Sequence, residues 1–345
     1  MNQLMREIRE QPEGIARLIT EHGEQFERAA EAIRARDVKQ VLIAARGTSD
    51  NAARYAQYLW GYQHRLPVAL ATPSLYTVYR TPPRLADTLV IGISQSGTSP
   101  DIVSVVADAQ AQGMLTLAIT NTAESPLAET AELVINCHAG LEQAVAATKT
   151  YTAQLAAVAL LGAALGQDEA ARTALLEVPV ALERTLAAND QLEQAAQRYA
   201  PVRAGAVVGR GFNYCTAFEI ALKVGELAYV GATPYSSADF MHGPIALVEP
   251  GYPVILVAPS GQVHAELHAL GETLRERGAD LLVVSDDEAT LALATTPMPL
   301  AAGLPEWATP LIAAVPGQLL GHHLAIAKGY DPMTPRSLNK ITKTL

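Results

Sequence analysis

Short apolar runs alternate with helix-like segments along the first half of the chain. The apolar runs are Val41–Ala45, Leu89–Ser94, Leu115–Ile119 and Leu133–Asn136. Continuous apolar runs of this length are typical of strands that are buried on both faces of a sheet. The segments between them, such as Asn51–Gly61 and Asp101–Ala111, have helical character. This alternation predicts an α/β fold built on a doubly wound parallel sheet flanked by helices.

The strand-and-turn pattern occurs twice. Gly47 ends an apolar strand in Ile43-Ala-Ala-Arg-Gly47, and Gly211 ends a similar strand in Val207-Val-Gly-Arg-Gly211, 164 residues later. Gly97 and Gly261 follow two further apolar strands and are also 164 residues apart. Two pairs at one offset indicate a duplicated domain, so the sequence predicts two tandem copies of the fold.

The regions outside the two copies have helical composition. Asn2–Arg36 predicts a helical pair that the Gln11-Pro12 step separates, because proline disfavours a helical conformation in the residue before it. The long Ala/Glu/Arg-rich segment Gln167–Ala200 predicts a connector. We therefore expect N-terminal helices in 1–36, the first domain in 37–166, a helical connector in 167–200, the second domain in 201–330 and a tail in 331–345.

Length and charge narrow the function classes. The chain has 345 residues, enough for about two domains, and 25 Lys and Arg against 35 Asp and Glu give a net charge of −10. With no basic run, a nucleic-acid partner is not expected. The first residues lack the apolar segment of a signal peptide, and the longest apolar run, Leu155–Gly166, is too short to cross a bilayer. We expect a cytoplasmic protein without membrane contact.

Cys137 and Cys215 do not have the spacing of a disulfide scaffold or a zinc site.

Hydroxyl side chains gather where one predicted strand meets a helix. The segment Ser94-Gln-Ser-Gly-Thr-Ser99 carries four of them, and hydroxyl and backbone N–H groups at a helix start suit a phosphate. A plain N-cap is the alternative, since serine and threonine are common there. Thr48 and Ser49 lie in the first glycine turn at the same edge of the sheet. Ala144–Thr150 is expected to begin a helix with small residues that let a ligand approach the backbone.

The nucleotide-binding motifs do not fit. Thr98 stands where a P-loop requires lysine, and Tyr214 occupies the third glycine position of a GxGxxG pattern. ATP and NAD are therefore disfavoured, and no cofactor is expected.

The second copy supplies charged groups on an apolar helix. Ala217–Val230 is apolar nearly all round, and Glu219, Lys223 and Glu226 interrupt it on one face. Spacing alone fits a solvent-facing Glu–Lys ladder. The apolar surroundings favour the other interpretation, because buried charges are costly unless they are paired or face a polar cavity. A desolvated carboxylate beside a lysine could act as a general base.

The histidines give weaker signals. His242 precedes Gly243-Pro244, where a structural role is more common than a catalytic one. His264 and His268 have i, i+4 spacing without the HExxH pattern, and we interpret them, like His322 and His323, as a solvated helix face. No metal site is predicted.

Six short motifs follow one another along the chain: ARGTS, SQSGTSPD, AVAATKTY, ALKVGELAY, MHGP and Arg336-Ser-Leu-Asn-Lys340. They occur in the order found in the SIS (sugar isomerase) family, and the chain resembles that family over essentially its whole length. It is similar to the isomerase domain of glutamine–fructose-6-phosphate aminotransferase, and it looks closer still to stand-alone glucosamine-6-phosphate deaminases of the same fold.

The resemblance implies two tandem SIS domains, a homodimer whose active site is completed across subunits, and a role for each matched residue. Glu226 would carry a proton between C1 and C2, and Lys223 would support it. His242 would assist ring opening from the other subunit, and Lys340, in the tail, would reach the open-chain carbonyl. Residues implied to bind the sugar phosphate are Thr48, Ser49, Ser94, Gln95, Ser96 and Ser99, with Val145 and Ala146 lining the sugar.

The resemblance also implies a reaction. Because the chain begins with Met1 almost directly at the isomerase helix, no glutaminase is expected within it. The favoured activity is therefore conversion of glucosamine 6-phosphate to fructose 6-phosphate and ammonia. The alternatives are an aminotransferase-type homologue without glutaminase, a fructosamine-6-phosphate deglycase and a non-catalytic sugar-phosphate sensor. The presence of Glu226, His242 and Lys340 together argues against the sensor.

Overall fold

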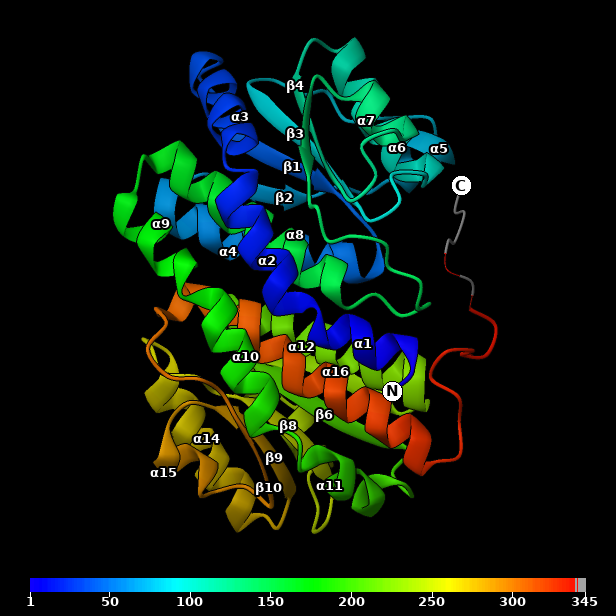
Figure 1. Ribbon diagram of the computed structural model, residues 1–345, viewed down its shortest axis with the longest axis vertical. Helices are drawn as coiled ribbons and strands as arrows, with labels where there is room; N and C mark the ends of the chain where they lie inside the picture. Colours follow the sequence, from blue (N-terminus) through cyan, green and yellow to red (C-terminus); the bar gives the residue numbers. More distant parts are fainter. Residues whose placement is uncertain (339, 341–345) are drawn as a thin grey trace. The chain divides into compact units, whose positions relative to one another are not determined.

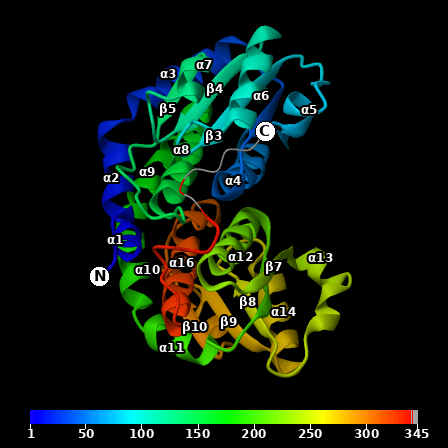
Figure 2. The same cartoon turned by 90° about the vertical axis from the view of Figure 1, so that its right-hand side faces the viewer.

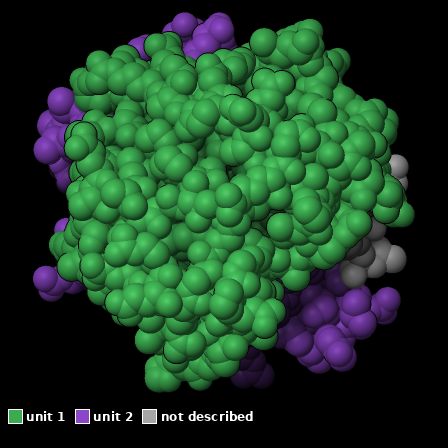
Figure 3. Space-filling view, turned by 90° about the horizontal axis from the view of Figure 1, so that it is seen from below, with its two compact units in different colours: residues 1–12, 143–148, 177–338 green, residues 13–142, 149–176, 339–345 purple. Residues whose placement is uncertain are grey.

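The computed structural model describes residues 1–338 and residue 340, which divide into two units with one sheet each. Unit 1 holds residues 1–12, 143–148 and 177–338, and unit 2 holds residues 13–142 and 149–176 together with Lys340. Figure 3 colours the chain by unit. Asn339 of the predicted tail motif and residues 341–345 lie outside the described residues.

Unit 2 is built on a five-stranded sheet in the order β2-β1-β3-β4-β5, and every neighbouring pair is parallel. Four of its strands lie within one residue of the predicted bounds. The short edge strand β2 was not predicted, because three residues give too little pattern. The strands are β1 (Gln40–Ala44), β2 (Val68–Leu70), β3 (Thr88–Ser94), β4 (Leu115–Thr120) and β5 (Leu133–Asn136).

Helices cover both faces of this sheet (Figure 1). Val90 and Ala118 point to one face, where they pack with Val106 of α6 and Leu127 of α7. On the other face α4 packs against α8, and the Trp60 indole N–H donates to the carbonyl of Val158. The helices are α2 (Gln11–Glu21), α3 (Glu24–Ala35), α4 (Gly47–His64), α5 (Ser74–Thr77), α6 (Pro100–Ala111), α7 (Pro126–Thr130), α8 (Lys149–Gly166) and α9 (Glu169–Leu176).

Unit 1 repeats the arrangement of unit 2. Its parallel strands lie in the order β10-β9-β8-β6-β7, so β6, β7, β8, β9 and β10 take the places of β1 to β5. The predicted α/β fold with two doubly wound parallel sheets is therefore confirmed. The strands are β6 (Ala204–Gly209), β7 (Gly231–Ser236), β8 (Pro253–Val257), β9 (Asp280–Ser285) and β10 (Thr296–Pro299).

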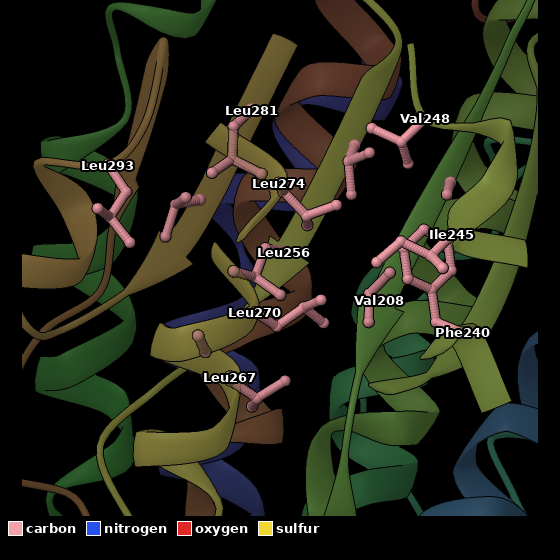
Figure 4. Packing of buried hydrophobic residues seen from close by; sticks show 14 residues of the cluster. Val208, Phe240, Ile245, Val248, Leu256, Leu267, Leu270, Leu274, Leu281 and Leu293 are labelled. Atoms are coloured by element: carbon pink, nitrogen blue, oxygen red, sulfur yellow. The ribbon is translucent and has the colours of Figure 1, made fainter. Parts of the chain in front are cut away.

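One apolar core of unit 1 lies between its sheet and α14. Leu256 and Val208 from the strands meet Leu267, Leu270 and Leu274 of that helix (Figure 4). On the other face α12 packs closely on α16 (Figure 2). The helices are α1 (Gln3–Arg9), α10 (Val178–Ala188), α11 (Leu192–Tyr199), α12 (Tyr214–Ala228), α13 (Ser237–Met241), α14 (His264–Glu276), α15 (Glu288–Leu291) and α16 (Pro310–Ala327), with 3-10 turns η1 (Gly211–Asn213), η2 (Pro244–Leu247) and η3 (Glu306–Ala308).

The α16 segment is a core helix. Glu306–Ala327 is long and apolar enough to cross a membrane by length and composition, yet 83% of its most apolar window is buried inside the protein. A Cβ atom at Gly317 would meet the side chain of Ile220 on α12, so the small residue permits the close contact of these helices.

Two predicted helical segments are wrong in detail. Asn2–Arg36 forms three helices and not a pair, because a second break at His22-Gly23 separates α2 from α3. Ala144–Thr150 does not begin a helix at its first residue. α8 starts at Lys149, and the backbone N–H groups of Gln143 and Ala144 instead donate to the buried carboxylate of Glu7.

The interpretation of His322 and His323 as a solvated face is also wrong. His322 is 4% exposed, and its Nε2 lies 2.9 Å from Nδ2 of Asn2. Burial lowers the pKa of His322 to about 4, with the neighbouring His323 adding to the effect. The ring is therefore held neutral inside the protein.

This burial predicts a loss of stability in acid. The folded-state pKa lies below the usual value of about 6.5, so the unfolded chain binds the proton more tightly. Stability from this residue is complete above pH 6.5 and falls by about 3 kcal/mol as the pH drops toward 4. Urea unfolding at several pH values should show a shallower decline for His322→Gln. An equal decline in both proteins would contradict the prediction.

Candidate functional site

The sheet topology of unit 2 directs attention to one edge. β1 lies between β2 and β3, so the chain continues in opposite directions from β1 and from β3. In open parallel sheets, ligands bind outside the carboxyl ends of the two strands at such a switch point. Residues 45–49, which include the first turn of α4, follow β1, and the loop 95–99 follows β3. Together with Ser94, the last residue of β3, they contain the predicted phosphate-binding residues. The structure thus brings Thr48, Ser49, Ser94, Gln95, Ser96 and Ser99 to neighbouring strand ends.

The loop after β3 is a tight turn that is rich in hydroxyl groups. Ser94 is buried and accepts a hydrogen bond from the Gly97 N–H. Ser96 and Thr98 hydroxyl oxygens lie 2.9 Å apart. Gly97 has φ +64°, and a Cβ there would meet Ser125, so only glycine fits without strain. The turn therefore has a fixed shape, with half-buried hydroxyl groups at Ser96 and Ser99.

Two long helices begin at this edge. The 12-residue α6 starts at Pro100, and the side chain of its N-cap Ser99 makes no capping hydrogen bond. The 18-residue α4 starts at Gly47. Helix starts present backbone N–H groups and a partial positive charge, which together favour an anion. The arrangement suits a phosphate group.

Ser49 and Thr48 differ in their surroundings. Ser49 is buried, and its hydroxyl oxygen accepts a hydrogen bond of 3.0 Å from Gln154 of α8. Thr48 is half-buried at the start of α4. Of the two, Thr48 is therefore the more accessible to a ligand.

Arg46 is a residue that the sequence analysis did not single out. It is the N-cap of α4, and its Nε donates to the fully buried carboxylate of Asp101 at 2.8 Å. Half of the Arg46 side chain stays exposed, so one guanidinium lies at the edge where the hydroxyl groups gather. Its place inside the ARGTS motif was the available signal, but a single arginine in an acidic chain does not stand out.

Lys340 meets a buried carboxylate in unit 2. Its Nζ lies 3.2 Å from Glu142, whose side chain is fully buried and also accepts the Thr150 N–H. Nearby, burial raises the pKa of the Cys137 thiol to about 12, with the charge of Glu142 adding to the effect. Cys137 therefore stays a thiol at neutral pH and is no nucleophile.

The charged residues of α12 form one cluster in unit 1. Lys223 is 1% exposed, and its Nζ donates to Glu226 at 2.6 Å and lies 3.5 Å from the fully buried Glu219. Glu226 keeps 25% of its side chain exposed. The prediction that Glu219, Lys223 and Glu226 share one face of the helix is confirmed. The alternative of a solvent-facing ladder is excluded, because Lys223 and Glu219 are buried. Lys223, paired with Glu219, thus holds the Glu226 carboxylate, which solvent can reach.

The other predicted residues of unit 1 lie apart from α12 in sequence. His242 is exposed at the C-terminal end of α13. Val145 is half-buried and Ala146 is buried, in the irregular segment that Glu7 holds through backbone N–H groups. Their assigned roles remain predictions.

His264 and His268 are not a solvated face. His264 Nε2 and His268 Nδ1 lie 3.0 and 2.8 Å from the hydroxyl oxygen of the buried Thr290, and Asp287 lies beside them. Contacts with α15 and its N-cap thus partly bury both rings, which keep 23% and 28% of their side chains exposed.

Known proteins of one family match this chain. The family model described as SIS domain matches residues 35–164 and 203–296. Among curated proteins, glutamine–fructose-6-phosphate aminotransferase [isomerizing] from Zymomonas mobilis is 35% identical, with 88% of this chain and 52% of that protein covered. The enzyme of that name from Mycolicibacterium smegmatis is 37% identical, covering 98% and 56%. The chain spans about half the length of these relatives.

Solved structures give the same fold. A protein from Silicibacter pomeroyi, provisionally named a phosphosugar isomerase, is 33% identical with a TM-score of 0.85, covering 96% of this chain and 100% of its own. The C-terminal domain of glucosamine-fructose-6-phosphate aminotransferase from Francisella tularensis is 26% identical with a TM-score of 0.86, covering 97% and 98%. Glucosamine-6-phosphate deaminase from Thermotoga maritima has a TM-score of 0.78 at 22% identity, covering 99% and 100%, which shows the fold alone.

The α12 cluster predicts a large stability cost for losing its lysine. Lys223→Met removes a buried cation that lies 3.5 Å from the buried Glu219 and 2.6 Å from Glu226, which should lower the free energy of unfolding by about 3–5 kcal/mol. Lys39→Met removes an exposed lysine paired with Asp37 and should change it by less than about 1 kcal/mol. Urea denaturation measures both. Equal small effects would show that the cluster is not charged inside the folded protein.

Proposed function

The chain belongs to the SIS domain family, and we propose that it is an enzyme of the sugar-phosphate isomerase type whose specific reaction is the deamination of glucosamine 6-phosphate. The observation that carries the proposal is the α12 cluster, in which the buried Lys223, paired with the buried Glu219, holds a solvent-accessible Glu226. Burying two charges is costly, and positioning a general base is a chemical use for such an arrangement.

We assign phosphate binding to the carboxyl ends of β1 and β3 in unit 2. Ser96, Ser99 and Thr48 offer hydroxyl donors, and the α4 and α6 helix starts offer backbone N–H groups. Arg46 supplies positive charge there while paired with Asp101. A site of this composition can hold a phosphate monoester although the chain carries a net charge of −10.

We assign Glu226 as the general base that transfers a proton between C2 and C1. Ring opening, which His242 assists, gives the open-chain aldehyde, and Lys340 contacts its carbonyl. The carboxylate then takes the proton from C2 while the C1 oxygen gains a proton from water, which forms an enolamine with a C1 hydroxyl group. The carboxylate returns its proton to C1, which gives an imine at C2. Water adds to that imine, and expulsion of the amine gives fructose 6-phosphate and ammonia. Lys223 orients the carboxylate through its 2.6 Å hydrogen bond.

A second candidate is interconversion of aldose and ketose 6-phosphates as in the isomerising half of an aminotransferase. Identities of 35% and 37% to the two aminotransferases favour it. Glu226 would transfer the proton between C1 and C2 in the same way. The substrate would carry a hydroxyl group at C2 in place of the amine, and no ammonia would be released. Product analysis separates the two candidates.

The proposal includes the setting of the enzyme. We place it in the cytoplasm as a homodimer, in which a second copy of the chain supplies His242. The exposure of His242 at the end of α13 supports this assignment, because an exposed side chain is available to another subunit.

Glu226→Gln should abolish turnover. The substitution keeps the shape of the side chain and an oxygen for Lys223, but removes the base, so kcat should fall by roughly 10²–10⁴-fold. Ammonia and fructose 6-phosphate are both measured with glucosamine 6-phosphate as substrate, and Glu249→Gln, at an exposed position, is the control. If the wild type forms fructose 6-phosphate from glucose 6-phosphate but no ammonia from the amino sugar, the second candidate holds. Full activity of Glu226→Gln would contradict both candidate reactions.

Ser96→Ala should weaken substrate binding. The Ser96 hydroxyl is expected to donate to the phosphate in the ground state and the transition state alike, so KM should rise by roughly tenfold with kcat little changed. Ser104→Ala is the matched control, since that hydroxyl donates to the Pro100 carbonyl within α6. An unchanged KM in Ser96→Ala would take Ser96 out of the phosphate site.

A further inference from the structure

Two histidines and an aspartate of unit 1 converge at the carboxyl edge of its sheet. His264 and His268 lie one turn apart at the start of α14, and Asp287 is the N-cap of α15. The candidate ligand atoms of the three side chains all lie within 4.8 Å of one another. None of the three belongs to the residues assigned to the sugar phosphate.

The helix that carries the histidines is firmly fixed. Leu267, Leu270 and Leu274 of α14 insert into the core beside the sheet (Figure 4). His264 and His268, at i and i+4, therefore have a backbone that packing holds in place. Side chains four residues apart lie on the same face of a helix, so both rings can reach one ion.

The distance between one pair of donor atoms is close to that of a metal site. His264 Nε2 lies 3.6 Å from Asp287 Oδ2. Two donors that are each about 2.0–2.1 Å from a tetrahedral Zn²⁺ lie about 3.4 Å apart. The ligands would need to move by only a few tenths of an ångström at this pair.

Thr290 provides the supporting contacts that metal ligands require. Its backbone N–H and its hydroxyl group both donate to Asp287 Oδ2, at 2.8 and 2.7 Å. These two hydrogen bonds orient the carboxylate of Asp287. Outer contacts of this kind are typical of ligands at metal sites.

Carboxylates occupy the backbone N–H groups of the neighbouring loop, which disfavours an anion there. This edge corresponds to the phosphate-binding edge of unit 2, since β8 and β9 take the places of β3 and β4. Here, however, the backbone N–H of Ser260 donates to Asp286 and that of Gln262 to Glu306, both at 2.6 Å. The chain's own carboxylates thus occupy the N–H groups that an anion would use.

We propose that His264, His268 and Asp287 form a binding site for a divalent transition-metal ion of the Zn²⁺ class. His264 Nε2, His268 Nδ1 and a carboxylate oxygen of Asp287 are three ligands, and water completes a tetrahedron. In the structure these two nitrogens lie 3.0 and 2.8 Å from the Thr290 hydroxyl oxygen. On metal binding each ring exchanges that contact for the ion and, in its neutral form, carries the proton on its other nitrogen. The bound ion ties α14 to the start of α15 and stabilises unit 1. This site is separate from the proposed catalytic residues, so it stands whether or not the chain is a deaminase.

Titration of the full chain with ZnCl₂ tests the site. After removal of any affinity tag and treatment with a chelator, isothermal titration calorimetry should give one Zn²⁺ per chain. Excess Zn²⁺ should raise Tm by roughly 2–5 °C, because a ligand that binds the folded state stabilises it. His264→Ala and His268→Ala should each weaken binding by at least about tenfold.

Two further variants keep the test decisive. Asp287→Asn retains a good N-cap and an oxygen for Thr290, so the fold should persist while Zn²⁺ binding falls. His22→Ala removes a histidine of unit 2 and should leave binding unchanged. Absence of stoichiometric binding to the wild type overturns the proposal. Equal affinity in the wild type, His268→Ala and Asp287→Asn also overturns it, because the ion would then bind elsewhere.

Discussion

The parallel arrangement of the strands is the constraint on which the rest of the structure depends. Parallel neighbours cannot be joined by tight turns, so each connection crosses a face of the sheet, mostly through a helix. All strands then end at one edge, and the helices that follow begin there with free N–H groups. The hydroxyl-rich loop after β3 and the start of α4 meet at neighbouring strands for this reason. The proposed phosphate site is thus a consequence of topology.

The same topology in unit 1 leads to a different chemistry. The loop after β8 holds Gly261 at the position equivalent to Gly97, but the Glu306 carboxylate fills the space beside it. Two backbone N–H groups that correspond to an anion site are satisfied by carboxylates of the chain itself. The duplicated fold has kept its geometry, while in unit 1 the chain's own carboxylates occupy these N–H groups. Unit 1 instead presents a solvent-accessible carboxylate on α12 and a histidine pair on α14.

Burial gives the α12 cluster its character. The lysine and one carboxylate are almost completely removed from water, whereas Glu226 remains accessible. Packing of α12 on α16 through the small residues Gly317 and Gly321 excludes water from the helix face. The buried salt bridge between Lys223 and Glu219 therefore fixes the position of the Glu226 carboxylate. An exposed ladder of the same sequence would leave the carboxylate free to move.

The sequence by itself determined the α/β class and the bounds of four of the five strands of unit 2, because continuous apolar runs are a local pattern. It also determined the duplication, because the offset of 164 residues can be counted along the chain. It also placed Glu219, Lys223 and Glu226 on one helical face. It did not determine which of them is exposed, that Ser49 is occupied by Gln154, that Arg46 pairs with Asp101, or that His264, His268 and Asp287 converge. Only the tertiary structure decided these points, since burial and long-range contacts arise when distant segments pack together.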